Sequence, residues 1–134
     1  MTAEKSQYIE AVGRRKTAIA RVRLTPAAKQ SIRINEKEMA DYFKTSELQR
    51  MALESMEKSG VTQKFAITAK LLGGGISSQA EAVRLGVARC LEKFDGTLRT
   101  ILKKEGFLTR DQRAVERKKP GLKKARKRPT WSKR

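Results

Sequence analysis

The sequence predicts an α+β domain, a small sheet with helices packed on one face, followed by a long extended basic tail. Two observations carry this prediction. Apolar residues recur at strand spacing and then at alternating helix and strand spacing as far as Leu108. Much of the formal net charge of +18 then follows, because residues 110–134 hold 12 Lys or Arg against 2 Asp or Glu. We therefore divide the chain into a globular body, residues 1–108, and a tail, residues 109–134.

The first strands are expected near the N-terminus. Residues 8–24 have the strand period: Ala18, Ala20, Val22 and Leu24 alternate with Ile19, Arg21 and Arg23. Thr25-Pro26 is expected to break this run, and a short strand, residues 31–34, follows. Within the first segment, Gly13 precedes a basic turn and would permit close approach to a phosphate backbone. An ordinary charged hairpin is the alternative interpretation of this turn.

Two helical segments are expected next. Residues 36–43 are expected to form a short helical stretch. Ser46 and Gln49 have the spacing of a capping box that opens a second helix. Apolar residues then recur at helical spacing, and Gly60 suits the position just past the helix end.

The clearest strand runs from Val61 to Leu71 and ends at the three glycines 73–75. Ser78 and Glu81 have the spacing of a second capping box. The helix that follows is expected to bury one apolar stripe, which comprises Ile76, Ala80, Val83, Val87, Cys90, Leu91 and Phe94. Gly86 lies on the same stripe. Because glycine inside a helix costs roughly 1 kcal/mol relative to alanine, we attribute it to close approach of helix and sheet.

A last helix is expected over residues 97–105, ended by Gly106. Beyond Leu108 the apolar pattern stops. The apolar side chains of the tail outside its prolines are Ala114, Val115, Leu122, Ala125 and Trp131. Burying so few groups cannot offset the entropy of ordering the segment, roughly 1–2 kcal/mol per residue. The tail is therefore expected to take its order from a partner.

Catalytic and metal-binding residue sets are missing from the sequence. The chain has no histidine and one cysteine, Cys90, so a disulfide within the chain is impossible and a Cys/His metal site lacks ligands. Cys90 is expected in the core. We therefore expect no enzyme, cofactor or small-molecule substrate. Residues 1–7 are polar and no apolar run reaches membrane-spanning length, so we expect a soluble intracellular protein without a membrane partner.

Dense positive charge makes nucleic acid the expected partner, because basic runs bind phosphates with release of counterions. A solvated tail or a localisation signal is the alternative. The expected phosphate contacts are Arg14, Arg15, Lys16 and Arg21 in the body and Arg110, Arg113, Arg117, Lys118, Lys119, Lys123, Lys124, Arg126, Lys127 and Arg128 in the tail.

Two further features leave alternatives open. Trp131 could stack on a base or ribose, or fold back on the body. The glycines 73–75 before a helix could cradle a phosphate, or could form a simple strand-to-helix turn. They are not a Walker motif, because the lysine followed by Ser or Thr is missing.

Four segments of the chain, in order, resemble one known family. They are Val12–Ala18 with Ala20–Val22; Ile34-Asn35 with Asp41–Phe43; Gly73–Gln79 with Gly86–Arg89; and Gly106–Asp111 with Glu116–Lys119 and Ser132–Arg134. Together they span nearly the whole chain and resemble the universal ninth protein of the small ribosomal subunit, in its bacterial form. Two positions depart from the family pattern: Trp131, where phenylalanine or tyrosine is commoner, and Cys90, where a small residue is commoner.

The resemblance implies a fold and a function. The family's body shares an α+β fold with other ribosomal proteins and elongation factor G, and contains a left-handed βαβ crossover, an exception to the right-handed rule. It binds ribosomal RNA (rRNA) in the small-subunit head, beside neighbouring head proteins, in cytoplasmic ribosomes. Residues Ser132, Lys133 and Arg134 match those that approach the transfer RNA (tRNA) in the peptidyl site. The alternative is a free nucleic-acid-compacting basic protein, which would need neither Gly73–Ser77 nor this C-terminal match.

Overall fold

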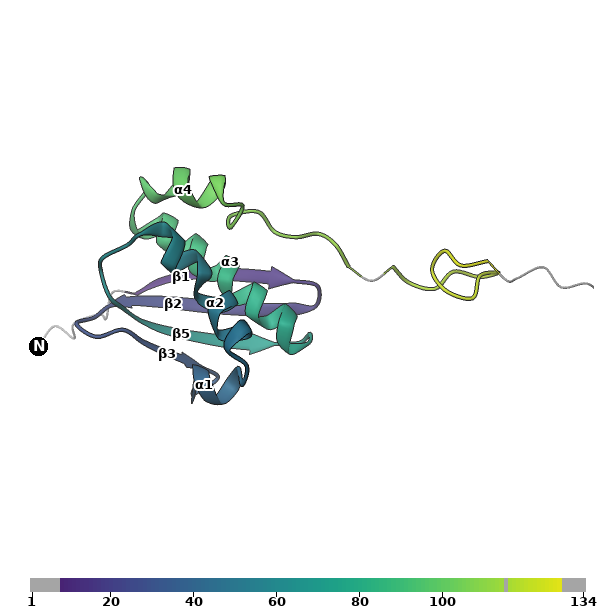
Figure 1. Ribbon diagram of the computed structural model, residues 1–134, viewed down its shortest axis with the longest axis horizontal. Helices are drawn as coiled ribbons and strands as arrows, with labels where there is room; N and C mark the ends of the chain where they lie inside the picture. The colour runs from purple at the N-terminus through teal and green to yellow at the C-terminus, as the bar shows by residue number, and fades with distance from the viewer. Residues whose placement is uncertain (1–7, 115, 129–134) are drawn as a thin grey trace, which may run out of the picture.

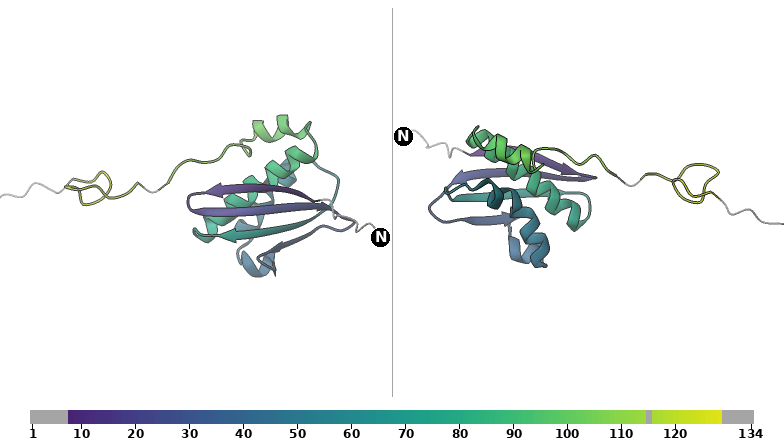
Figure 2. Two further views of the ribbon diagram at one scale, coloured as in Figure 1. Left: turned by 180° about the vertical axis from the view of Figure 1, so that it is seen from behind. Right: turned by 45° about the horizontal axis from the view of Figure 1, so that its top comes forward.

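The computed structural model describes residues 8–114 and 116–128. Its elements are β1 (Ile9–Arg15), β2 (Ala18–Pro26), β3 (Ser31–Ile34), β4 (Lys37–Glu38), α1 (Met39–Tyr42), α2 (Ser46–Ser59), β5 (Phe65–Leu72), α3 (Ile76–Phe94) and α4 (Leu98–Lys104). The sheet of the described residues has the strand order β1-β2-β5-β3-β4, in which β3 and β5 pair parallel and the other neighbours pair antiparallel. Helices α2 and α3 cover one face of the sheet, and the other face is open (Figures 1 and 2). The expected α+β class is confirmed.

The core lies between the sheet and the helices. The inward faces of β2 and β5 have the expected strand alternation. Their buried side chains are Ala18, Ala20, Val22, Leu24, Phe65, Ile67, Ala69 and Leu71. On α3 the stripe formed by Ala80, Val83, Val87, Cys90 and Leu91 is almost inaccessible to solvent. Each large apolar side chain buried in this way contributes about 1.5–3 kcal/mol, which holds the two layers together.

Two glycines let α3 approach the sheet closely. A Cβ on Gly13 of β1 would lie 1.9 Å from the carbonyl oxygen of Ala82, and a Cβ on Gly86 would lie 2.6 Å from Cγ2 of Val22. The expectation that Gly86 marks close packing of helix and sheet is therefore confirmed. The interpretation of Gly13 as a point of phosphate approach was wrong, because α3 occupies the space beside it.

The extended segment at the N-terminus is a hairpin. Strands β1 and β2 pair antiparallel from Ile9–Leu24 to Arg15–Ala18, and the turn contains Lys16 with φ of 54°. The hairpin alternative for the basic turn is thus the observed geometry. The run ends where it was expected to end, because Pro26, which has no backbone N–H to donate, is the last residue of β2.

Both expected capping boxes were wrong, although both helices exist. Thr45 and Gly75 stand at the two N-cap positions, and neither helix start has a side-chain cap hydrogen bond. Gln49 instead donates to the Phe43 carbonyl at 2.7 Å. Glu81 binds Arg15 of β1 at 2.5 Å. Other partners therefore take the side chains whose spacing suggested caps: the residue two before the N-cap for Gln49, and a distant strand for Glu81.

The limits of several elements differ from expectation. Ile76 and Phe94, which were expected on the buried stripe, lie at the two ends of α3 and are 54% and 39% exposed. Phe94 still packs edge-on against Phe65, with ring centroids 5.0 Å apart. Residues 36–43 begin with β4 before the short helix α1, and β5 starts at Phe65 rather than at Val61.

The three glycines before α3 form a structural turn. Gly73 and Gly74 have φ of +71° and +67°, a conformation that L side chains rarely adopt. Gln79 donates to the Gly73 carbonyl at 2.9 Å and accepts a 2.6 Å hydrogen bond from the Tyr42 hydroxyl. These contacts join two of the segments that resemble the family, Asp41–Phe43 and Gly73–Gln79. The residue types of both segments are therefore explained by the way they pack together.

We expect Gly13→Ala to destabilise the fold by about 1–3 kcal/mol, as overpacking does. The added methyl would collide with the α3 backbone, which cannot move without loss of core contacts. Gly96→Ala is the matched control, because a Cβ there meets nothing within 4 Å. Urea unfolding of the two variants measures the difference. Equal unfolding midpoints would contradict the proposed close approach.

Candidate nucleic-acid interface

Two neighbouring arginines at the end of β1 face opposite sides of the sheet. Arg14 is exposed, whereas Arg15 is turned toward the helical layer with only 12% of its side chain exposed. The guanidinium of Arg15 binds Glu81 of α3 through Nε, lies 3.5 Å from Oδ2 of Asp111, and donates to the Arg113 carbonyl through Nη1. It therefore joins β1, α3 and the first residues of the tail.

Residues 109–113, the tail root, are held by this arginine. Asp111 accepts hydrogen bonds from the backbone and side chain of Arg113, and these keep the pKa of Asp111 well below its usual range, with Arg15 adding a weaker attraction. A lowered pKa keeps the carboxylate ionised. The hydrogen bonds between Asp111 and Arg113 therefore stabilise the tail root at pH values above the ordinary pKa of aspartate. This stabilisation is lost only as the pH falls through the lowered pKa of Asp111. At neutral pH Arg15 of the body therefore faces an ionised carboxylate in the tail root.

Residues 116–127, the tail loop, fold around one acidic residue. Glu116 binds Lys119 and, at 2.8 Å, Arg126, and hydrogen bonds from these two side chains lower the pKa of Glu116. The backbone N–H of Lys123 donates to the Lys127 carbonyl at 2.9 Å. Figure 1 shows this loop well away from the body. Exposed ion pairs of this kind contribute little to the free energy of folding, so the loop can open at low cost.

The other expected contact residues are exposed. In the body these are Arg14, Lys16 and Arg21. In the tail they are Arg110, Arg113, Arg117, Lys118, Lys119, Lys123, Lys124, Arg126, Lys127 and Arg128. The side chains of Arg113 and Arg126 are each 85% exposed despite their ion pairs. Trp131, Ser132, Lys133 and Arg134 lie outside the described residues.

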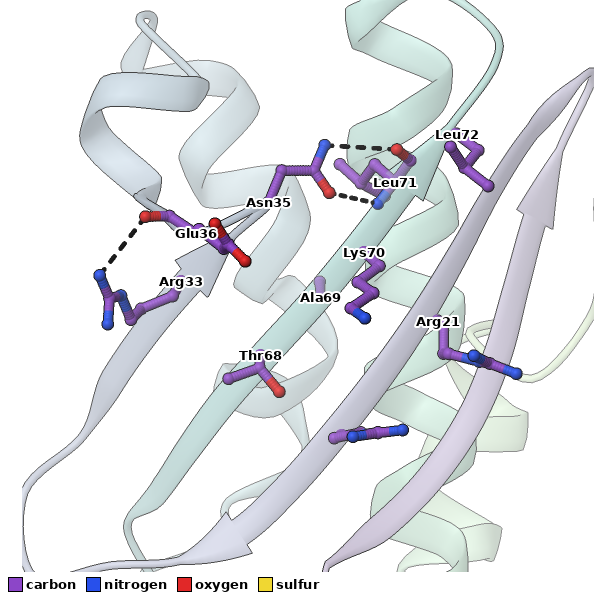
Figure 3. Close-up of a pocket in the computed structure, with 10 residues that line it drawn as sticks. Arg21, Arg33, Asn35, Glu36, Thr68, Ala69, Lys70, Leu71 and Leu72 are labelled. Carbon is purple, nitrogen blue, oxygen red and sulfur yellow. Dashed lines mark hydrogen bonds between the residues drawn. The ribbon is translucent and has the colours of Figure 1, made fainter.

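The open face of the sheet carries, beside the expected contact Arg21, three basic residues that were not among the expected contacts: Arg23, Arg33 and Lys70. A groove of about 530 Å³, here called the sheet groove, lies over β2, β5 and β3 (Figure 3). It is lined by Arg21, Arg23, Arg33, Asn35, Glu36, Thr68, Ala69, Lys70, Leu71 and Leu72. The signal that could have found its cations was the outward set of each strand, since alternate residues share a face.

Asn35 closes one side of the sheet groove. Its φ is 50°, and β3 ends just before it. The side-chain amide then continues the pairing with β5, accepting from the Leu71 N–H at 2.8 Å and donating to the Leu71 carbonyl at 3.3 Å (Figure 3). The Asn35 amide thus takes the place of a β3 residue beside β5. It supplies hydrogen-bond partners for the backbone N–H and C=O of Leu71.

These features define a class of protein: a small basic α+β domain with a cationic sheet face and an anchored cationic tail, as nucleic-acid-binding proteins have. In the part of the chain that the structure describes, helices are too short or too polar to cross a membrane. The family described as ribosomal protein S9/S16 matches residues 13–134.

Curated relatives agree with this match over nearly the whole chain. The small ribosomal subunit protein uS9 of Azobacteroides pseudotrichonymphae genomovar. CFP2 is 45% identical over 128 residues, covering 96% of this chain and 99% of its own length. The protein of the same name from Thermotoga maritima is 50% identical over 125 residues, covering 91% and 92%. The chain therefore belongs to the ribosomal protein S9/S16 family.

We expect Arg15→Gln to loosen the tail root while the body stays folded, because the glutamine amide cannot bind Glu81, Asp111 and the Arg113 carbonyl together. Amide hydrogen exchange over residues 109–113 should become faster. Arg14→Gln is the matched control, since it removes the same charge one residue away on an exposed side chain. Unchanged exchange in the Arg15 variant would show that the tail root is held by other contacts.

Proposed function

We propose that this chain is a structural constituent of the small ribosomal subunit, in which the body and the tail bind rRNA beside other ribosomal proteins. The observation that carries this proposal is a net charge of +18 in a member of a ribosomal protein family, with the cations on an open sheet face and along an anchored tail. Such a protein neutralises RNA phosphates and performs no chemistry. It acts in cytoplasmic ribosomes, as a component of translation.

The body and tail have different tasks in this proposal. Residues 1–108 form the globular rRNA-binding unit, with Arg14, Lys16 and Arg21 directed to phosphates. Residues 109–134 form the basic arm, whose lysines and arginines from 110 to 128 lie along RNA in the head of the subunit. Arg15, first expected to bind rRNA, has its donors occupied by protein groups. Its proposed task is to aim the tail.

We further propose that the connection from β3 through α2 to β5 is a left-handed βαβ crossover. The two strands are parallel neighbours, and α2 lies on the helical face between them in sequence (Figure 1). The tail is proposed to be extended when it lies on RNA, with the tail loop opened by exchange of its ion pairs for phosphate contacts. A left-handed crossover would match the family resemblance.

The end of the tail is proposed to reach the tRNA in the peptidyl site. This rests on the match of Ser132, Lys133 and Arg134 to the family. A guanidinium can place two hydrogen bonds on one phosphate, whereas Lys133 adds a charge with less geometric demand. The contacts of Arg15 with Asp111 and the Arg113 carbonyl support this proposal, because they hold the start of the tail at one place on the body.

A free protein that compacts nucleic acid is the second candidate, favoured only by the high net charge. Ribosome-profile fractionation separates the two proposals. We expect the tagged chain to co-sediment with small subunits and to stay with them at moderate salt. A spread over DNA or over all RNA-containing fractions would favour the compacting protein and overturn the ribosomal proposal.

Deletion of residues 132–134 tests the proposed contact with tRNA. We expect small subunits to assemble nearly normally, because the body and the basic runs at 117–128 remain. Dissociation of tRNA from the peptidyl site should become faster, since a lost charge-assisted hydrogen bond is worth roughly 1.5–3 kcal/mol before redundancy with other contacts. Off-rates measured at two salt concentrations on reconstituted subunits provide the test. Equal rates for full-length and truncated protein would refute this contact, and failed assembly would show that the segment binds elsewhere.

A further inference from the structure

One face of the sheet has no helix over it (Figure 2, left). An uncovered face of an antiparallel sheet usually carries mixed polar side chains that water solvates. This face instead gathers cations from three neighbouring strands around the sheet groove: Arg21 and Arg23 from β2, Lys70 from β5 and Arg33 from β3. The concentration of one sign of charge requires an explanation other than solubility.

Two of these cations stand directly opposite each other. Arg21 is the register partner of Lys70, and like charges in opposite positions destabilise a sheet. Glu10 on β1 offsets part of the repulsion by binding Arg21 at 2.8 Å and Arg23 at 3.7 Å. Among the described residues, Lys70 has no salt-bridge partner, and Glu36 supplies the one carboxylate in the groove lining. The unbound face therefore keeps a repulsion that a bound anion would relieve.

An apolar row lies next to the cationic one. Leu72 is 71% exposed and its register partner Ile19 is 39% exposed, one position along the same face from Arg21 and Lys70. Exposed aliphatic groups gain nothing from water. Cations beside an exposed apolar step suit single-stranded RNA, whose phosphates need positive charge and whose bases and riboses need a surface to lie on.

We propose that the sheet groove binds a single strand of rRNA, with phosphates on Arg21, Lys70 and Arg33 and a base or ribose against Leu72 and Ile19. This deepens the proposed function and rests on it. The acidic surface of a neighbouring protein would also meet the cations, but it would leave the apolar row without a partner of matching chemistry. The sheet groove is thus a second RNA contact, separate from the tail and on the opposite side of the sheet from α3.

The native cysteine allows a clean positional test. Burial raises the pKa of the Cys90 thiol to about 12, and its side chain is inaccessible, so Cys90 does not react at neutral pH. Thr68→Cys then places one reactive thiol in the sheet groove, and Thr100→Cys places one on α4, on the helical side of the body. Both replaced threonines are exposed, so the two variants are matched.

Each variant, carrying a tethered iron–EDTA group, is assembled with small-subunit rRNA and the other small-subunit proteins. We expect hydroxyl radicals from position 68 to cut a short, discrete rRNA segment, and those from position 100 to cut that segment much less. Absence of cuts from position 68, or capture of a protein by a thiol crosslinker there, would overturn the proposal. Failure of the unmodified chain to assemble would instead refute the proposed function.

Charge removal gives a second, independent measurement. In the double variant Arg33→Gln with Lys70→Gln, log affinity for small-subunit rRNA should fall less steeply with log salt concentration. The magnitude of the slope should decrease by roughly 1.4, about 0.7 for each single-strand phosphate no longer neutralised. The free variant should unfold at the same or a higher temperature, because a repulsion is removed. Lys103→Gln with Lys104→Gln on α4 removes the same charge and should change the slope much less. Equal slopes for the two double variants would overturn the proposal.

Discussion

The backbone contact between β1 and α3 is the constraint on which the arrangement of the molecule depends. Gly13 and Gly86 leave no side chain between the strand and the helix, so the two backbones meet. Because strand residues two apart share a face, Arg15 follows Gly13 on the helical side and reaches Glu81, which directly precedes Ala82 at the contact. The close packing of an apolar core thereby fixes the position of a charged group at its rim, and that group holds the tail root.

The same alternation divides the basic residues between two tasks. Arg14 and Arg15 are adjacent in sequence, yet one is exposed and the other is held among protein groups. On β2 the outward set contains Arg21 and Arg23, which share Glu10 and leave the neighbouring strands without compensation. A single acidic residue thus offsets part of the repulsion between these cations while most of the face stays positive. The tail uses Glu116 in a comparable way, gathering cations that remain exposed.

Much of the fold could be predicted from the sequence, since alternation in β2 and β5 and the stripe on α3 report directly which side chains are buried. The capping boxes failed because a four-residue pattern cannot reveal that Gln49 will bind the Phe43 carbonyl or that Glu81 will bind Arg15. The sheet groove was missed for a related reason. Arg23, Arg33 and Lys70 are far apart in sequence, and strand order brings them together.

The sequence by itself determined the class of the protein, the extent of its core and the basic character of its tail, because burial periodicity and net charge are properties of composition and spacing. Only the tertiary structure decided which cations are free to meet RNA. That choice depends on strand register, on the order β1-β2-β5-β3-β4 and on the one face that α2 and α3 cover. Register, strand order and the covered face are relations between segments that are distant in sequence. The contacts that stabilise them form only when the sheet and the helices pack together.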